Sequence, residues 1–69
     1  MSGVEVLLNG DRTTLEKGAT VRQLVQRMVG SERGVAVSID REVVPRSSWG
    51  DVELRGGALI EVLTAAAGG

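Results

Sequence analysis

The chain has 69 residues, enough for one small domain but too few to enclose a deep pocket for a large substrate. Its size therefore argues against an independent enzyme. Eight basic and nine acidic residues leave a formal net charge of −1, and Trp49 is the only aromatic residue. Nucleic-acid binding normally needs a basic face or aromatic stacking platforms, so we expect no nucleic-acid partner.

The sequence contains neither cysteine nor histidine. This composition excludes zinc fingers, disulfide bonds and catalysis by a thiol or an imidazole. Asp11, Asp40 and Asp51 are dispersed turn residues rather than a metal cluster. No apolar run is long enough for a transmembrane helix or has the form of a signal peptide. We therefore expect no bound metal or cofactor, no membrane contact and a cytoplasmic location.

The first elements predict a β-hairpin. Apolar residues within 4–8 indicate one strand and residues 12–16 a second, with Asn9-Gly10 between them. Asn-Gly is the strongest short-range hairpin signal because both central residues of a type I′ turn adopt positive φ. Lys17-Gly18 closes this unit.

A short amphipathic helix follows. Thr20 is the predicted N-cap, and Gln23 three residues later completes a capping box. The helix should end near Val29, with Gly30 in the position after the C-cap. Apolar residues recur on one helix face at Val21, Leu24, Val25 and Met28. A helix this short depends on packing that face onto a sheet.

The middle of the chain predicts two more strands. Residues 35–39 alternate between larger apolar and small residues, which is typical of a half-buried strand. Asp40-Arg41 forms a turn into a short strand over 42–44. Pro45 ends that strand or holds it at a sheet edge, because proline has no N–H to donate.

The last third predicts a helical turn and a final strand. Residues 46–50 form the turn, with Trp49 pointing inward, and residues 51–54 add a brief extended piece. Residues 55–57 form a glycine-rich turn, and residues 58–64 form the last strand.

This order of elements predicts an α+β fold of the β-grasp, or ubiquitin-like, type. We expect a mixed sheet of about four to five strands with one main helix packed on one face. The first and last strands then lie side by side and parallel at its centre. Residues 1–64 form the domain, and residues 65–69 a flexible tail. The expected core comprises Val6, Leu8, Leu15, Val21, Leu24, Val25, Met28, Val37, Ile39, Ile60 and Val62.

The terminal Gly68-Gly69 is the first candidate site. Glycine loses the most backbone entropy on ordering, so such an end resists packing, and without side chains it can enter a narrow active site on another protein. A tail of five residues from Ala65 reaches at most about 16–18 Å. Taken alone, these residues are equally compatible with a disordered end or an expression scar.

A second candidate lies on the sheet face away from the helix. If Val6 and Val62 face the helix, Leu7 and Leu63 face outward on adjacent strands, and we expect them to lie near each other. We interpret this pair as a docking patch; scattered surface apolarity is the alternative. Arg46 is a further candidate that pairs with a partner carboxylate, against the alternative of a solvated surface arginine.

Two segments carry a resemblance to a known family. The segment Val43-Val44-Pro45-Arg46-Ser47-Ser48-Trp49 and the terminal Ala67-Gly68-Gly69 resemble the bacterial sulfur-carrier proteins of thiamine biosynthesis, the ThiS family. The resemblance extends over essentially the whole chain. Asp40, where the family often has asparagine, and the small Ala66 are mild departures.

The resemblance implies a protein co-substrate rather than an enzyme. An E1-like adenylyltransferase consumes ATP to adenylate the Gly69 carboxylate, which then becomes a thiocarboxylate and delivers sulfur to thiazole synthase. Gly68, Ala67 and Ala66 thread into the partner's channel. The carrier itself binds no cofactor and is a monomer when alone. The absence of cysteine fits this role, because the carrier has no side-chain thiol to attack its own activated terminus.

Two alternatives share the same fold and terminus. The chain could carry sulfur for molybdopterin or cysteine synthesis, or it could be a protein modifier that forms isopeptide bonds. The terminal glycines do not discriminate among these roles, and the sequence names no sulfur donor.

Overall fold

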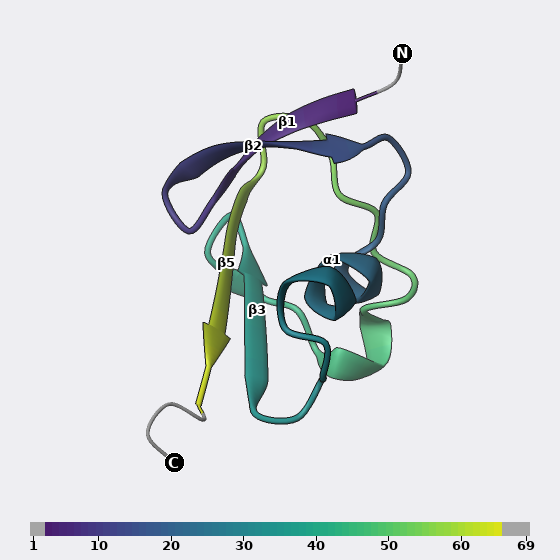
Figure 1. Cartoon of the computed structure of the whole chain (residues 1–69), viewed down its shortest axis with the longest axis vertical. Coiled ribbons are helices and arrows are strands. Elements are labelled where there is room, and N and C mark those ends of the chain that lie inside the picture. The colour runs from purple at the N-terminus through teal and green to yellow at the C-terminus, as the bar shows by residue number, and fades with distance from the viewer. Residues whose placement is uncertain (1–2, 66–69) are drawn as a thin grey trace.

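Five strands and one α-helix form the described part of the chain, residues 3–65 of a computed structural model (Figure 1). The sheet has the order β2-β1-β5-β3-β4. In chain order, the elements are β1 (Gly3–Leu8), β2 (Asp11–Glu16), α1 (Val21–Met28), β3 (Val35–Ile39), β4 (Glu42–Val43), the 3₁₀ turn η1 (Arg46–Ser48) and β5 (Leu59–Thr64).

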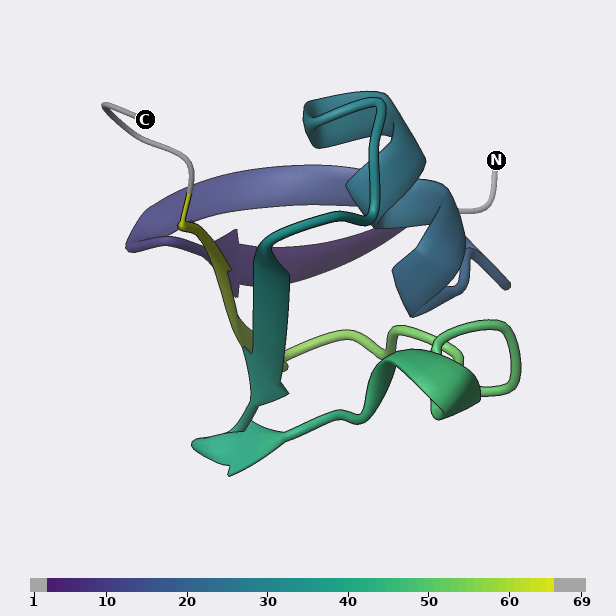
Figure 2. The same cartoon turned by 90° about the horizontal axis from the view of Figure 1, so that it is seen from below.

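The predicted β-grasp topology is confirmed. β1 and β5 are parallel, with Leu7 opposite Leu59 and Leu8 opposite Ile60, whereas β5 pairs with β3 in antiparallel orientation. α1 lies on one face of the sheet, and η1 lies beside its beginning (Figure 2). No helix among residues 3–65 is long and apolar enough to cross a membrane.

The hairpin turn forms as predicted and has a second role. Asn9 and Gly10 have φ values of 50° and 88°, as a type I′ turn requires. The Asn9 side chain also accepts a hydrogen bond from the Val62 N–H at 2.8 Å and donates one to the Val62 carbonyl at 3.2 Å. β1 ends at Leu8, so this amide takes the place of a peptide group and extends the pairing along β5.

The helix start is also as predicted. The Thr20 hydroxyl accepts from the Gln23 N–H at 3.3 Å, and the Gln23 side chain accepts from the Thr20 N–H at 2.9 Å. The helix ends at Met28, with Val29 as C-cap and Gly30 at φ 80°. The capping box therefore fixes the point at which the chain leaves the hairpin and crosses the sheet.

The core differs from the prediction at its margins. Met28 is 43% exposed because it lies in the last turn of a short helix, so its assignment to the core was wrong. Leu8 and Ile39 are only partly buried. Trp49 points inward as predicted, and its Nε1 donates to the Val44 carbonyl at 2.8 Å. The buried residues are Val6, Leu15, Val21, Leu24, Val25, Val37, Trp49, Leu54, Ala58, Ile60 and Val62.

Leu54 is the main core residue that the sequence did not reveal. Its segment runs along the helix entry: the Val21 N–H donates to the Val52 carbonyl, and the Leu54 N–H donates to the Ala19 carbonyl at 2.8 Å. The expected extended piece over 51–54 therefore exists as a single bridge between Thr20 and Glu53, and it places Leu54 under the helix. β5 begins at Leu59, one residue later than predicted.

Candidate functional site at the end of β5

β5 leads the chain from the middle of the sheet to the C-terminal segment. It lies between β1 and β3, and its inward side chains Ile60 and Val62 are 0% and 5% exposed. Burial of each such side chain contributes about 1.5–3 kcal/mol. The strand is therefore firmly held in the domain along the length that precedes the terminus.

Hydrogen bonding continues to the last described residue. The Ala65 N–H donates to the Gly34 carbonyl at 2.7 Å, next to the pairing of Thr64 with Val35. Gly34 has φ 67°, a conformation that favours glycine, so the connection before β3 can turn there. The predicted reacting and threading residues, Gly69, Gly68, Ala67 and Ala66, lie outside the described residues.

The proposed outer-face pair does not form one patch. Leu7 and Leu63 are 42% and 66% exposed and share the face away from α1. However, Leu7 lies opposite Leu59, and Leu63 comes four residues after Leu59, about 13 Å further along β5. The expectation that they are neighbours was wrong because alternation fixes the face of a strand but not its register.

The register gives Leu63 a different set of neighbours. Ala36 in β3 lies directly opposite Leu63, and both are exposed. Two pairs further along, on the same face, Ser38 donates to Glu61 at 3.2 Å. Val43 in β4, 77% exposed, lies opposite Ser38. We call Leu63, Ala36 and Val43 the outer patch. The sequence could have indicated that Ala36 faces outward, because side chains alternate along a strand and its neighbour Val37 faces the core.

Arg46 lies in another part of the molecule. It begins η1, which Figures 1 and 2 both show on the helix side and away from the end of β5. Its carbonyl accepts from Arg22 Nη2 at 3.2 Å and from the Trp49 N–H at 3.1 Å. The structure therefore does not bring Arg46 together with Leu63.

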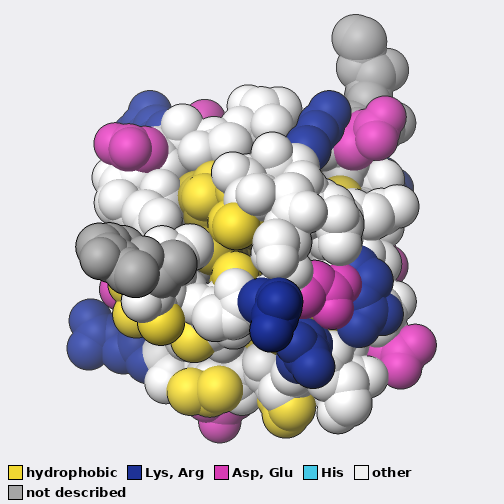
Figure 3. Space-filling model, turned by 60° about the horizontal axis from the view of Figure 1, so that its bottom comes forward, with side chains coloured by type: hydrophobic (Ala, Val, Ile, Leu, Met, Phe, Trp, Pro, Cys, Tyr) yellow, Lys and Arg dark blue, Asp and Glu magenta, His cyan; other side chains and the backbone are white. Residues whose placement is uncertain are grey.

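The ion pair on the helix side is structural. Arg22 Nε lies 2.8 Å from Glu32 Oε2 and joins α1 to the connection before β3. The hydrogen bond from Arg22 lowers the pKa of Glu32, and the charge of Arg22 and a hydrogen bond from Gln26 act in the same direction. Figure 3 shows basic and acidic side chains gathered on this face, with hydrophobic side chains visible beside them.

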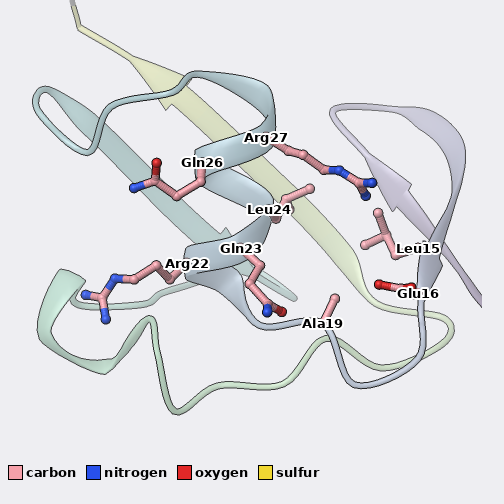
Figure 4. A pocket seen from close by; sticks show the side chains of 8 residues that line it. All are labelled: Leu15, Glu16, Ala19, Arg22, Gln23, Leu24, Gln26 and Arg27. Carbon is pink, nitrogen blue, oxygen red and sulfur yellow. The ribbon is translucent and has the colours of Figure 1, made fainter.

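The surface of residues 3–65 is hollowed in several places, two of which lie near the elements discussed above. A groove of about 430 Å³ lies between α1 and β2, with Leu15 and Leu24 facing each other across it (Figure 4). A second hollow of about 350 Å³ lies beside the turn after Leu54. No three carboxylates gather as a metal site in this part of the chain. The groove is lined by Leu15, Glu16, Ala19, Arg22, Gln23, Leu24, Gln26 and Arg27.

Comparisons with known proteins all find members of one family, ThiS. The family model of the ThiS family matches residues 6–69. The chain is 27% identical over 66 residues to the sulfur carrier protein ThiS of Escherichia coli strain K12, covering 96% of this chain and all of that protein. The crystal structure of the thiamine biosynthesis protein ThiS from Geobacter metallireducens has the same fold, with a TM-score of 0.79 at 23% identity. That match covers 96% of this chain and 100% of that one.

Proposed function

Because the chain belongs to the ThiS family, we propose that it is a sulfur carrier whose reacting group is the C-terminal carboxylate of Gly69. The observation that carries this proposal is the family match through residue 69, on a chain whose last strand is hydrogen-bonded up to Ala65. Because this strand is held in the sheet close to the reacting group, a partner that binds the folded domain also positions the terminus.

The chemistry requires activation by a partner, because a carboxylate is a poor electrophile. A carboxylate oxygen of Gly69 attacks the α-phosphorus of ATP and releases pyrophosphate, which forms an acyl-adenylate on an E1-like adenylyltransferase. Hydrosulfide then attacks the acyl carbon, the bond to AMP breaks, and the terminus becomes a thiocarboxylate. The chain is therefore a co-substrate, and the partner provides the catalytic groups.

We assign the thiocarboxylate to thiazole formation in thiamine synthesis, with thiazole synthase as acceptor. The E. coli relative is named a sulfur carrier, and the Geobacter relative is named a thiamine biosynthesis protein. Gly68, Ala67 and Ala66 thread toward the partner's active site because none has a bulky side chain. A cytoplasmic location follows from this role.

Docking of the domain onto the activating enzyme is assigned to the outer patch. Leu63 is the residue of the patch closest in sequence to the terminus, and exposed apolar side chains of this kind favour partner binding. Leu7 lies on the same face at a distance and serves as a flanking contact, whereas Arg46 contacts only a partner that also reaches the helix side.

The proposal is tested by incubating the chain with ATP, its cognate activating enzyme and a sulfur source, followed by intact-mass analysis. We expect the mass change for replacing one carboxylate oxygen with sulfur, localised to Gly69. Removal of Gly68-Gly69 should abolish this change while leaving the thermal midpoint unaltered. An unchanged mass with an enzyme that activates a known carrier would refute the proposal. Thiamine-independent growth of a deletion strain would redirect the sulfur to another pathway.

A further inference from the structure

β2 is an open edge of the sheet. It pairs only with β1, and its other side has no neighbouring strand within residues 3–65. The opposite edge, β4, has only two residues and is followed by Val44 and then Pro45, so it offers little backbone for pairing. β2 is therefore the edge at which another strand can extend this sheet.

The register of the hairpin shows which backbone groups are available. The Asn9-Gly10 turn makes Leu8 and Asp11 a hydrogen-bonded pair, and such pairs alternate along an antiparallel ladder. Arg12, Thr14 and Glu16 therefore direct their N–H and C=O groups away from β1. Within the described chain, the only additional bond to these groups is from the Ala19 N–H to the Glu16 carbonyl.

The side chains of this edge have a self-complementary order of charge. Residues 11–17 read Asp-Arg-Thr-Thr-Leu-Glu-Lys, and the four charged side chains among them are exposed. Reversal of this segment about Thr14 places Arg12 opposite Glu16, and Asp11 opposite Lys17. An antiparallel copy of the same strand would therefore meet opposite charges at both ends.

We propose that β2 pairs with β2 of a second copy of this chain, antiparallel and centred on Thr14. Arg12 then exchanges backbone hydrogen bonds with Glu16 of the second copy, and Thr14 with Thr14 of the second copy. This junction makes about six hydrogen bonds, and the Glu16 carbonyl takes part through its second lone pair because it already accepts from the Ala19 N–H. The monomer expected with the resemblance took no account of this edge, because the charge order has this meaning only when β2 is known to be an edge strand.

Other registers are disfavoured by the same geometry. A shift by one residue would pair outward-directed backbone groups with groups already bonded to β1. A shift centred on Arg12 or on Glu16 brings like charges together, which is destabilising on neighbouring strands. Centring on Thr13 or on Leu15 leaves Arg12 and Glu16 without an opposite charge. The Thr14 register alone uses every available group and pairs both charges.

The groove beside β2 accommodates the second strand. Leu15 and Thr13 face α1, and in this register each lies opposite the other residue of the second copy. Figure 4 shows the Arg27 side chain extending from α1 toward Leu15, across the mouth of the groove. Asp11 of the second copy faces the same side, diagonal to Leu15, so this cation complements it. The two helices lie on one face of a continuous sheet.

The junction is compatible with the proposed carrier role but does not depend on it. β1 separates β2 from β5, so the end of β5 and the outer patch residue Leu63 remain outside the interface. A single pair of edge strands is small beside stable interfaces, which bury about 1,600 Å². The dimer is therefore weak, and its population rises with protein concentration.

The proposal is tested by exchanging the charges at Arg12 and Glu16. Sedimentation equilibrium of the full chain, from micromolar to millimolar concentration, measures the dimer dissociation constant. Arg12→Glu and Glu16→Arg each place like charges at both ends of the junction and should raise the dimer dissociation constant about tenfold or more. The double variant restores opposite charges and should recover the wild-type value. Arg55→Glu, an exposed change of the same kind outside β2, is the matched control and should leave it unchanged.

The register is tested separately by isotope-filtered NMR on a mixture of labelled and unlabelled chains. We expect an intermolecular contact between the α-protons of Thr13 and Leu15, because non-hydrogen-bonded pairs bring these atoms closest. A monomer at millimolar concentration, or a dimer unaffected by Arg12→Glu, would overturn the proposal. So would failure of the double variant to recover association, or association mapped to β4. Binding of an extended peptide at β2 without self-association would also reject the second copy as occupant.

Discussion

Replacement of Asn9 tests the link between the hairpin turn and β5. Its side chain satisfies both backbone groups of Val62 at 2.8 and 3.2 Å, and its own backbone has φ 50°. Asn9→Ala removes both hydrogen bonds, at about 1 kcal/mol each. It also places a residue with a methyl side chain in the left-handed region, which costs roughly 1–2 kcal/mol. We expect a total loss of about 3 kcal/mol.

Asn9→Gly separates the two contributions. Glycine adopts positive φ without strain, so this variant loses the hydrogen bonds but keeps the turn. Its expected destabilisation is about 2 kcal/mol, somewhat smaller than that of Asn9→Ala. Such changes are large because a domain of this size has a total stability of order 3–10 kcal/mol.

Urea unfolding gives the stability, and amide hydrogen exchange at Val62 reports the local effect. The Val62 N–H donates to Asn9 Oδ1, so both variants should accelerate its exchange more than that of Leu24 in α1. The reasoning is refuted if Asn9→Gly is as stable as the wild type and Val62 exchanges at its original rate. In that case the side-chain bonds would add nothing to the sheet.

Four further substitutions test other parts of the structure. Leu54→Ala should cost about 2–5 kcal/mol because Leu54 is 1% exposed, whereas Met28→Ala at the exposed helix end should cost under about 1 kcal/mol; urea unfolding compares them. The hydrogen bond from Arg22 holds the pKa of Glu32 below its ordinary value, so the contribution of this carboxylate to stability is present above that ordinary value and is lost as pH falls through the folded pKa. The stability difference between wild type and Glu32→Gln, measured at several pH values, should therefore shrink on acidification, and a constant difference would contradict this. Leu63→Asp should weaken binding to the activating enzyme about tenfold or more without changing the thermal midpoint, while unchanged binding in a titration would exclude Leu63 from docking.

Local signals predicted most of the fold. Asn9-Gly10 predicted the turn, and Thr20 with Gln23 predicted the helix start, because each depends on bonds between residues close in sequence. The order of elements then allowed few topologies other than a β-grasp sheet. The predictions that were wrong depended on contacts between residues far apart in sequence. Met28 is exposed because of where the helix ends over the sheet, and the helical pattern alone does not give that position.

The site was predicted unevenly for the same reason. The outward face of Leu7 and Leu63 follows from alternation, but their separation follows from the parallel register of β1 and β5, which no local pattern encodes. The contact of Asn9 with Val62 spans 53 residues and was equally hidden. The terminal Gly68-Gly69 were predicted from their chemistry and from the resemblance rather than from the fold, and they stay a prediction because both lie outside the described residues.

These register effects converge on β5. β1 stops pairing at Leu8, opposite Ile60, so residues 61–64 of β5 would have an unpaired side next to the terminus. Asn9 bonds Val62 on that side, and β3 pairs as far as Thr64 on the other. If a partner positions Gly69 by binding the folded domain, these hydrogen bonds fix the direction in which the chain leaves β5 toward the terminus. A destabilised Asn9→Gly variant should then lower the rate of thiocarboxylate formation even under conditions where the chain remains fully folded. A wild-type rate for the folded variant would show that the order of β5 beyond Ile60 has no part in presenting the terminus.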